Sequence, residues 1–274
     1  MTTSSIDFDY IRKLVREHSA VTLEADKDYL AELHLAPLAR LAGVDSIAEL
    51  VAKLRTQPFN CLHMQAIEAL LTHETFFFRD LYPFEVLKNC LLPEFSKQRA
   101  VERTLNVWCA ACSSGQEPYS IAMMIREHFP MLTKWTLRLI ASDFSGDILA
   151  RARKGHYNQL EVKRGLPETL RDKYFQKQGN EWQIKEDIRQ MVEFRQINLI
   201  ESWPSLPAMD IIFMRNVLIY FDVETKKAIL SKVRQLIKPD GYLFLGGGET
   251  TLNLDNSFER IQFNKTVCYR LGNS

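Results

Sequence analysis

Apolar positions recur with helical spacing through residues 6–71. The segment FDYIRKLVREH carries an apolar stripe made of Phe8, Ile11, Leu14 and Val15. The next segment, DKDYLAELHLAPLARLAG, continues the pattern with Leu30, Leu33 and Leu41. Further helices are expected over SIAELVAKL, where Ser46 is a suitable N-cap, and over QAIEALLT at residues 65–72. The pattern therefore predicts a small all-helical N-terminal domain over residues 1–71.

Apolar strands and amphipathic helices alternate from about residue 83 onward. The segments, in chain order, are FEVLKNCLLPEF, TLNVWCA, EPYSIAMMIREHF, TLRLIASD, GDILARARKG, VEFRQINL, MDIIFMRN, VETKKAILSKVRQLI and GYLFLGGG. Repeated strands and helices in which the strands are nearly continuously apolar indicate a parallel sheet covered by helices on both faces. Residues 83–274 are thus predicted to form a Rossmann-like, doubly wound α/β sheet. The closing segments FERIQFN and TVCYRLG, joined at Asn264–Lys265, predict a hairpin with an antiparallel edge strand.

Two stretches interrupt this regular pattern. Residues 158–192 are more polar, and DKYFQKQGNEWQIKED within them predicts a short helix and a hairpin, hence a small β-subdomain inserted in the sheet domain. Residues 72–82 form a linker between the two domains, and its three phenylalanines, Phe76, Phe77 and Phe78, are expected to fasten the helical bundle to the sheet domain.

Composition excludes several classes of protein. No apolar run approaches the roughly 18 residues that span a bilayer, and the first residues lack the pattern of a secretion signal, so a cytoplasmic protein without membrane insertion is expected. A net charge of +1 argues against a nucleic-acid partner. Five scattered cysteines fit a reducing compartment, and isolated histidines with no second close cysteine pair predict no metal site. No long coiled-coil seam is present, so a monomer is expected.

The stretch WCAACSSGQEPYS, residues 108–120, permits three interpretations. Trp108–Cys112 has the spacing of a thioredoxin-type redox centre, in which the first thiol opens a helix. Here Pro118 is predicted to be the first helical residue, which leaves Ala110–Gln116 as a loop and both thiols short of the helix. A purely structural loop is the second interpretation. The third is a cofactor loop, because its small residues let a ligand approach the backbone after the first strand of a doubly wound sheet.

The third interpretation is the best supported by the residues around this loop. The loop lacks GxGxxG, which disfavours NAD, whereas S-adenosylmethionine carries no phosphate. Glu117 can hold the cofactor's ammonium group, or simply favour the helix dipole as a first-turn acid. Asp143, at the end of LIASD, can accept the ribose hydroxyls, or cap the helix that starts near Gly146. Asn198 and Leu199, expected at a strand end, can border the adenine.

With these pieces the chain resembles the CheR family of chemotaxis receptor methyltransferases along nearly its whole length. The motifs that carry the resemblance are LTHETFFFRD, CAACSSGQEPYSIA, ASDFSGDIL, INL and DIIFMRNVLIYFD. The resemblance implies that S-adenosylmethionine is the methyl donor and that glutamate side chains of chemoreceptors are the acceptors. It places Arg79 and Tyr220 at the reacting groups. The implied cofactor contacts are His73, Thr75, Arg79, Glu117, Asp143, Asn198, Leu199, Arg215 and Asn216.

The resemblance also implies a partner, namely the cytoplasmic helices of methyl-accepting chemotaxis receptors. Arg12 and Arg16 lie four residues apart on one helix face and can bind an acidic helix, or form an ordinary solvated face. The stretch Gln176–Ile188 is shorter than in relatives that bind a receptor's C-terminal tether peptide, so no tether binding is expected. Two alternatives stay open: a methyltransferase with another acceptor, and a non-catalytic module that binds cofactor or receptor. Amino-group acceptors are disfavoured, because RNVLIYF replaces the Asn/Asp-Pro-Pro-Tyr/Phe segment that such enzymes use.

Overall fold

The computed structural model describes residues 5–23 and 28–272, with side chains described for residues 7–23 and 31–272. The chain divides into two units. The first comprises Met1–Thr72 with Tyr220–Thr225, and the second comprises His73–Ile219 with Lys226–Ser274. Among the described residues, no helix is both long and apolar enough to cross a membrane.

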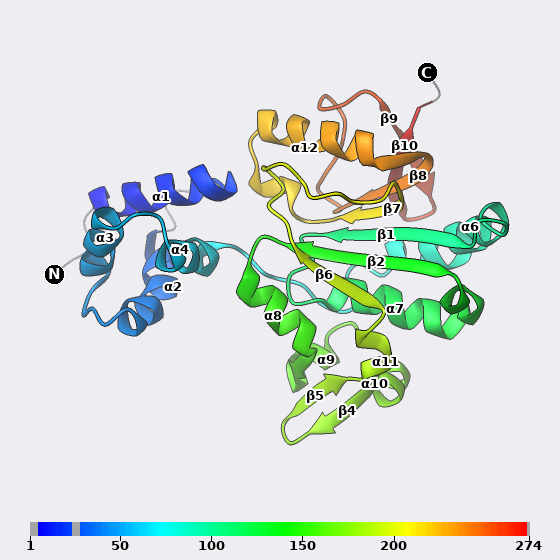
Figure 1. Ribbon diagram of the computed structural model, residues 1–274, viewed down its shortest axis with the longest axis horizontal. Helices are drawn as coiled ribbons and strands as arrows, with labels where there is room; N and C mark the ends of the chain where they lie inside the picture. Colours follow the sequence, from blue (N-terminus) through cyan, green and yellow to red (C-terminus); the bar gives the residue numbers. More distant parts are fainter. Residues whose placement is uncertain (1–4, 24–27, 273–274) are drawn as a thin grey trace. The chain divides into compact units, whose positions relative to one another are not determined.

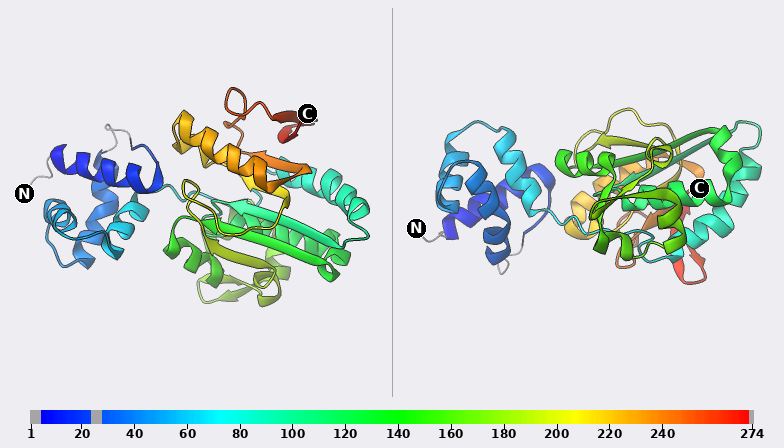
Figure 2. Two further views of the ribbon diagram at one scale, coloured as in Figure 1. Left: turned by 45° about the horizontal axis from the view of Figure 1, so that its top comes forward. Right: turned by 90° about the horizontal axis from the view of Figure 1, so that it is seen from below.

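The first unit is built from helices, as predicted (blue in Figure 2). They are α1 (Ser5–Ser19), α2 (Asp28–Leu41), α3 (Ile47–Thr56) and α4 (Cys61–Leu70). The stripe on α1 is buried, with side chains exposed by 6% or less. Ser46 caps α3 by accepting the N–H of Glu49, which confirms that prediction. Helix α4 begins at Cys61, earlier than predicted, because Asn60 Oδ1 accepts the Leu62 N–H and caps it.

The predicted apolar stripe on α2 is wrong. Leu33 and Leu41 are 68% and 85% exposed, and Leu30 lies outside the described side chains. Leu35 and Leu38 are buried instead. Leucines are spread around this helix, so more than one of its faces is apolar. Their spacing therefore did not determine which face is buried.

The second unit contains a seven-stranded sheet with the strand order β6-β2-β1-β7-β8-β10-β9. Five strands are parallel, and β10 runs antiparallel to both β8 and β9. This confirms the mostly parallel, doubly wound fold with an antiparallel edge. The strands are β1 (Thr104–Ala110), β2 (Thr136–Asp143), β6 (Val192–Gln196), β7 (Met209–Met214), β8 (Ile237–Leu245), β9 (Phe258–Phe263) and β10 (Thr266–Leu271).

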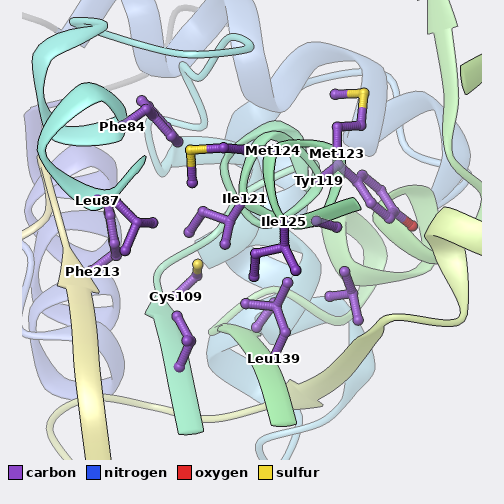
Figure 3. Close-up of a cluster of buried hydrophobic side chains, with 14 of the residues drawn as sticks. Phe84, Leu87, Cys109, Tyr119, Ile121, Met123, Met124, Ile125, Leu139 and Phe213 are labelled. Atoms are coloured by element: carbon purple, nitrogen blue, oxygen red, sulfur yellow. The ribbon is translucent and has the colours of Figure 1, made fainter. Parts of the chain in front are cut away.

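Helices lie on both faces of this sheet. The helical segments that flank its strands in the chain are α5 (Tyr82–Val86), the π-helical η2 (Leu87–Leu91), α6 (Leu92–Gln98), α7 (Gln116–His128), the 3₁₀ turn η3 (Pro130–Lys134), α8 (Gly146–Lys154), the 3₁₀ turn η4 (Leu218–Tyr220) and α12 (Val223–Leu236). Figure 1 shows α12 on the other side of the sheet from α7 and α8. In Figure 3, Ile121 and Ile125 of α7 lie over Cys109 and Leu139 of the strands. Burying these side chains fixes α7, and with it the loop that precedes it.

The insertion between β2 and β6 forms a second, three-stranded sheet with the order β3-β5-β4. Its elements are β3 (His156–Asn158), α9 (Gln159–Lys163), α10 (Glu168–Tyr174), β4 (Phe175–Gln178), β5 (Glu181–Ile184) and α11 (Glu186–Arg189). Phe77 of the linker packs edge-on against Tyr157 and Phe175 at ring distances of 5.0 and 5.6 Å. Phe78 packs against Phe84. These linker side chains are therefore anchored within the second unit.

Candidate functional site

The strand order creates a switch point beside β1. From β1 the chain moves outward through β2 to β6, and it then returns to the opposite side of β1 with β7 and β8. In open α/β sheets, ligands bind beyond the carboxyl ends of the strands at such a point. The residues predicted from the sequence on the sheet domain follow the carboxyl ends of β1, β2, β6 and β7, or lie in the linker.

The loop after β1 is shorter than predicted. It runs from Ala111 to Gly115, and α7 begins at Gln116, so Pro118 is the third helical residue and not the first. The reason is Gly115, whose left-handed φ of 93° turns the chain into the helix while its carbonyl accepts the Tyr119 N–H. Pro118 is tolerated there because the first N–H groups of a helix have no partner within it.

The two thiols of this region are buried and have no catalytic geometry. Cys109 lies within β1 and Cys112 in the loop, at 0% and 2% exposure. Burial raises the pKa of both thiols well above the usual value, and the negative charge of Glu117 adds to the shift. Neutral, inaccessible thiols do not support the redox interpretation. Within the described part of the chain, no cluster of three or more His, Cys, Asp or Glu side chains is arranged to hold a metal ion.

Asp143 ties the loop to the end of β2. Its Oδ2 accepts the Ser113 N–H at 2.8 Å, and its Oδ1 accepts the Ser145 N–H at 3.1 Å. The alternative role of Asp143 as a helix cap is wrong, because Ser145 caps α8 by accepting the Ile148 N–H. Burial raises the pKa of Asp143, while the two backbone N–H groups and His73 oppose the shift. A carboxylate has about four acceptor positions, so this one can still accept from a ligand.

The linker lies against the same loop. The His73 carbonyl accepts the Ser113 hydroxyl at 2.7 Å, and the Phe78 N–H donates to Ser120 Oγ at 3.0 Å. Thr75 is half-buried between them in the chain. The Arg79 guanidinium donates to the Glu74 carbonyl at 2.9 Å. The linker is thus hydrogen-bonded to the loop at His73 and to α7 at Phe78, whereas the Arg79 guanidinium binds within the linker itself.

Arg215, directly after β7, is the centre of a charge network in which Arg215 and Glu117 are buried and Asp80 is half exposed. Its guanidinium donates to Glu117 at 2.9 Å, to Asp80 at 2.6 Å and to the Arg79 carbonyl at 3.0 Å. Burial raises the pKa of Glu117, and the charge of Arg215 opposes that shift. The sequence predicted Glu117 and Arg215 as separate ligand contacts, whereas the structure pairs them. The sequence did not predict a role for Asp80. The only indication in the sequence is that Asp80 directly follows Arg79.

Asn198 and Leu199 follow β6 but do not belong to it, because the strand ends at Gln196. Asn198 Nδ2 donates to Glu201, and the buried Leu199 lies within the turn between them. Lys232 of α12 donates to the carbonyls of Leu199 and Glu201 at 2.5 and 2.7 Å and so holds this loop. Sequence reasoning missed Lys232, because it lies on the polar side of a helix.

Two side-chain atoms at the end of β7 are buried and lack a partner. Among the described residues, Arg215 Nε and Asn216 Oδ1 have no hydrogen-bond partner within the protein. A buried donor or acceptor left unpaired costs about 1–3 kcal/mol. One donor and one acceptor on adjacent residues suit a ligand that carries a carboxylate and an ammonium group, as the methionine part of S-adenosylmethionine does. The residues present therefore fit this cofactor.

The remaining predicted residues belong to the first unit. Tyr220 ends η4, four residues after Asn216, and is half-buried. Arg12 pairs with Asp9 at 2.6 Å, and Arg16 lies 3.8 Å from Asp222. Each arginine thus has an acidic neighbour, which weakens the local positive charge. The structure does not place these three residues with the others.

Comparisons with known proteins agree with this arrangement. The family model described as "CheR methyltransferase, all-alpha domain" matches residues 6–71, and "CheR methyltransferase, SAM binding domain" matches residues 73–267. The chemotaxis protein methyltransferase Cher2 of Pseudomonas putida is 40% identical over 98% of this chain and 99% of its own length. Chemotaxis protein methyltransferases 1 of Pseudomonas aeruginosa and Vibrio cholerae are 40% and 36% identical, each over 98% or more of both chains. With matches that span both units, the chain belongs to the CheR methyltransferase family.

Proposed function

We propose that this protein transfers a methyl group from S-adenosylmethionine to glutamate side chains of bacterial chemoreceptors and forms glutamyl methyl esters. The observation that supports the choice of acceptor is that the carboxylates described near the carboxyl ends of the strands already hold parts of the site in place. Asp143 accepts two backbone N–H groups, Glu117 and Asp80 pair with Arg215, and Glu249 accepts three backbone N–H groups. In this proposal none of them serves as a base for an amine. A glutamate acceptor needs no such base, because its reference pKa of about 4.3 leaves it ionised at neutral pH.

The cofactor is proposed to lie along the carboxyl ends of β1, β2, β6 and β7. Asp143 would accept the ribose hydroxyls, and Asn198 and Leu199 would border the adenine. Arg215 Nε and Asn216 Oδ1, unpaired within the described residues, would bind the methionine end beside Glu117. The linker residues His73, Thr75 and Arg79 would close the site, since the linker is hydrogen-bonded to the loop and to α7.

When bound, S-adenosylmethionine supplies a methyl group on a positively charged sulfur. The residues of the chain contribute by positioning, which can lower a barrier by about 7–11 kcal/mol when the reacting atoms are held in line. Arg79 is proposed to pair with a carboxylate of the cofactor or the acceptor. The Tyr220 hydroxyl is proposed to orient the acceptor by hydrogen bonding.

Receptor recognition is proposed for the helical unit, through Arg12 and Arg16 on α1. The absence of tether-peptide binding and the monomeric state stay predictions from the sequence.

The deciding experiment uses S-adenosylmethionine labelled in the methyl group. The full-length protein is incubated with membranes that contain chemoreceptors, and membranes without receptors are the control. Release of labelled methanol by alkali, only when receptors are present, is expected for a carboxyl methyl ester. Label that resists alkali would indicate another acceptor. Binding of S-adenosylhomocysteine without any methyl transfer would indicate a non-catalytic module.

A further inference from the structure

One carboxylate near the site has been given no role by the sequence, and the structure surrounds it with backbone donors. Glu249 lies just after β8, in the segment GGGET. Its Oε2 accepts the N–H of Gly246 at 2.6 Å and the N–H of Asn216 at 2.8 Å. Its Oε1 accepts the N–H of Ile219 at 3.1 Å. The side chain therefore joins the loop after β8 to the loop after β7.

The loop after β7 contains a left-handed residue. Asn216 has a φ of 59°, a conformation that is uncommon outside glycine but that asparagine adopts more often than most residues. Three N–H groups converge on one ionised carboxylate, and charge-assisted hydrogen bonds of this kind are roughly twice as strong as neutral ones. The carboxylate thus holds the main chain at the residue whose side-chain Oδ1 is buried and unpaired among the described residues.

The approach of the two loops is close enough to require glycine at one position. A Cβ on Gly246 would lie 2.7 Å from Asn216 Nδ2 and 2.8 Å from Glu249 Oε2. A Cβ on its neighbour Gly247 would meet no atom within 4 Å, so that position tolerates a methyl group. The glycine run therefore contains one position that the contact demands and another that serves as a control.

We infer that Glu249 is a positioning residue of the cofactor site: it holds the Asn216 main chain so that the Asn216 side chain faces the methionine end of S-adenosylmethionine. This inference rests on the proposed function, because it acts through a contact assigned there. Glu249 does not itself touch the cofactor. Its effect should therefore depend on the Asn216 side chain.

The test compares Glu249→Gln with the wild type by calorimetric titration with S-adenosylhomocysteine. The variant keeps the shape but replaces one acceptor oxygen by a donor and removes the charge, so the Kd is expected to rise about 10-fold. The KM for receptor membranes should change less than the Kd, because Arg12 and Arg16, which are proposed to bind the receptor, lie in the other unit. Gly246→Ala should weaken binding in the same way, and Gly247→Ala should leave it unchanged.

A double-variant cycle separates positioning from a general loss of stability. If Glu249 acts through Asn216, then Glu249→Gln should weaken binding much less in the Asn216→Ala background than in the wild type. Equal losses in both backgrounds, or unchanged affinity of Glu249→Gln, would overturn the inference. If Glu249→Gln fails to fold, equal affinities of Gly246→Ala and Gly247→Ala would overturn it. A wild-type protein that binds no S-adenosylhomocysteine would instead refute the proposed cofactor site.

Discussion

At the scale of single residues, the acidic side chains of this site are hydrogen-bonded to donors of the protein itself. Asp143 receives the Ser113 and Ser145 N–H groups, and Glu117 and Asp80 receive Arg215. Burial makes the charged forms of Asp143 and Glu117 costly, so these two charges need such donors. A carboxylate held in this way is ordered in advance, which lowers the cost of ordering it when a ligand arrives.

The raised pKa of Asp143 predicts how ligand affinity depends on pH. The ionised carboxylate accepts hydroxyl donors, so S-adenosylhomocysteine should bind more tightly as the pH rises through the raised pKa of Asp143. The ligand-free fold responds in the opposite sense. Because the folded pKa lies above the unfolded one, the stability that this group contributes is present below about pH 3.9 and is lost as the pH rises through the folded pKa.

The thermal shift produced by S-adenosylhomocysteine should therefore grow from about pH 4 to about pH 7. An analogue that lacks the ribose hydroxyls is the control, since it should bind more weakly and show a smaller dependence on pH. Equal pH dependence for both ligands would refute the assignment of Asp143 to the ribose. The raised pKa of Glu117 acts in the same direction for both ligands and so does not affect the comparison.

The cysteines provide a second test at this scale. Cys61 and Cys90 are exposed, while Cys109 and Cys112 are buried with raised pKa values. Iodoacetamide at neutral pH should modify the exposed pair and spare the buried pair, because alkylation requires an accessible thiolate. Peptide mass spectrometry reads out the modified positions, and denatured protein should be modified at all of them. Labelling of Cys112 as fast as Cys61 would restore the redox interpretation.

At the scale of elements, the turn from β1 into α7 depends on one glycine. Gly115 has a φ of 93°, and a Cβ there would lie 3.1 Å from both Ala152 and Tyr119. Helix α7 is fixed by its buried face, so the turn has little freedom to move away. The position of the loop is therefore set by the packing of the helix behind it.

Gly115→Ala should consequently lower the free energy of unfolding by about 2–4 kcal/mol, from left-handed strain together with crowding. It should also weaken S-adenosylhomocysteine binding by about 10-fold or more, because the loop is displaced. Gly179→Ala is the matched control: Gly179 is also left-handed, at 62°, but has nothing within 4 Å of its Cβ position. That variant should lose only about 1–2 kcal/mol and keep full affinity. Urea unfolding and calorimetry measure both quantities, and equal effects of the two variants would contradict the argument.

At the scale of the whole molecule, the residues proposed for cofactor binding and the arginines proposed for receptor binding lie in different units, while Tyr220 belongs to the first unit. The residues that fit a cofactor lie in His73–Ile219 and its continuation, and the arginines proposed for receptor binding lie in the helical unit. Residues 1–70 contain seven Lys or Arg and ten Asp or Glu, so this unit as a whole does not attract acidic helices. Any attraction must come from a local group of basic residues.

The double variant Arg12→Glu/Arg16→Glu tests that local group. It should raise the KM for receptor membranes by about 5- to 30-fold, which corresponds to about 1–2 kcal/mol, and leave the Kd for S-adenosylhomocysteine unchanged. Arg40→Glu makes the same charge change at an exposed position in the last turn of α2 and should have little effect. Methyl-transfer kinetics at several receptor concentrations provide the measurement. An unaltered KM would leave Arg12 and Arg16 as an ordinary solvated face.

Much of the architecture was predictable because it depends on local pattern. Strands such as Thr104–Ala110 are mostly apolar and almost wholly buried, which requires cover on both faces, and Ser46 caps α3 through a contact only three residues away. The polar residues that come after these strands were predictable for the same reason. Exact element ends were less so: α7 begins before Pro118, and β6 ends before Asn198, because backbone geometry at single residues sets those limits.

The fold class, the helical N-terminal segment and the residues at the strand ends follow from the order of amino acids, since burial and hydrogen bonding along each element act over short distances in the chain. Which of those residues bind one another depends on how the strands are arranged in the folded sheet. Arg215 meets partners 98 and 135 residues away, and Glu249 reaches across 33 residues to Asn216. Such pairs form because the strand order brings distant loops to one edge of the sheet, and no local pattern encodes that order.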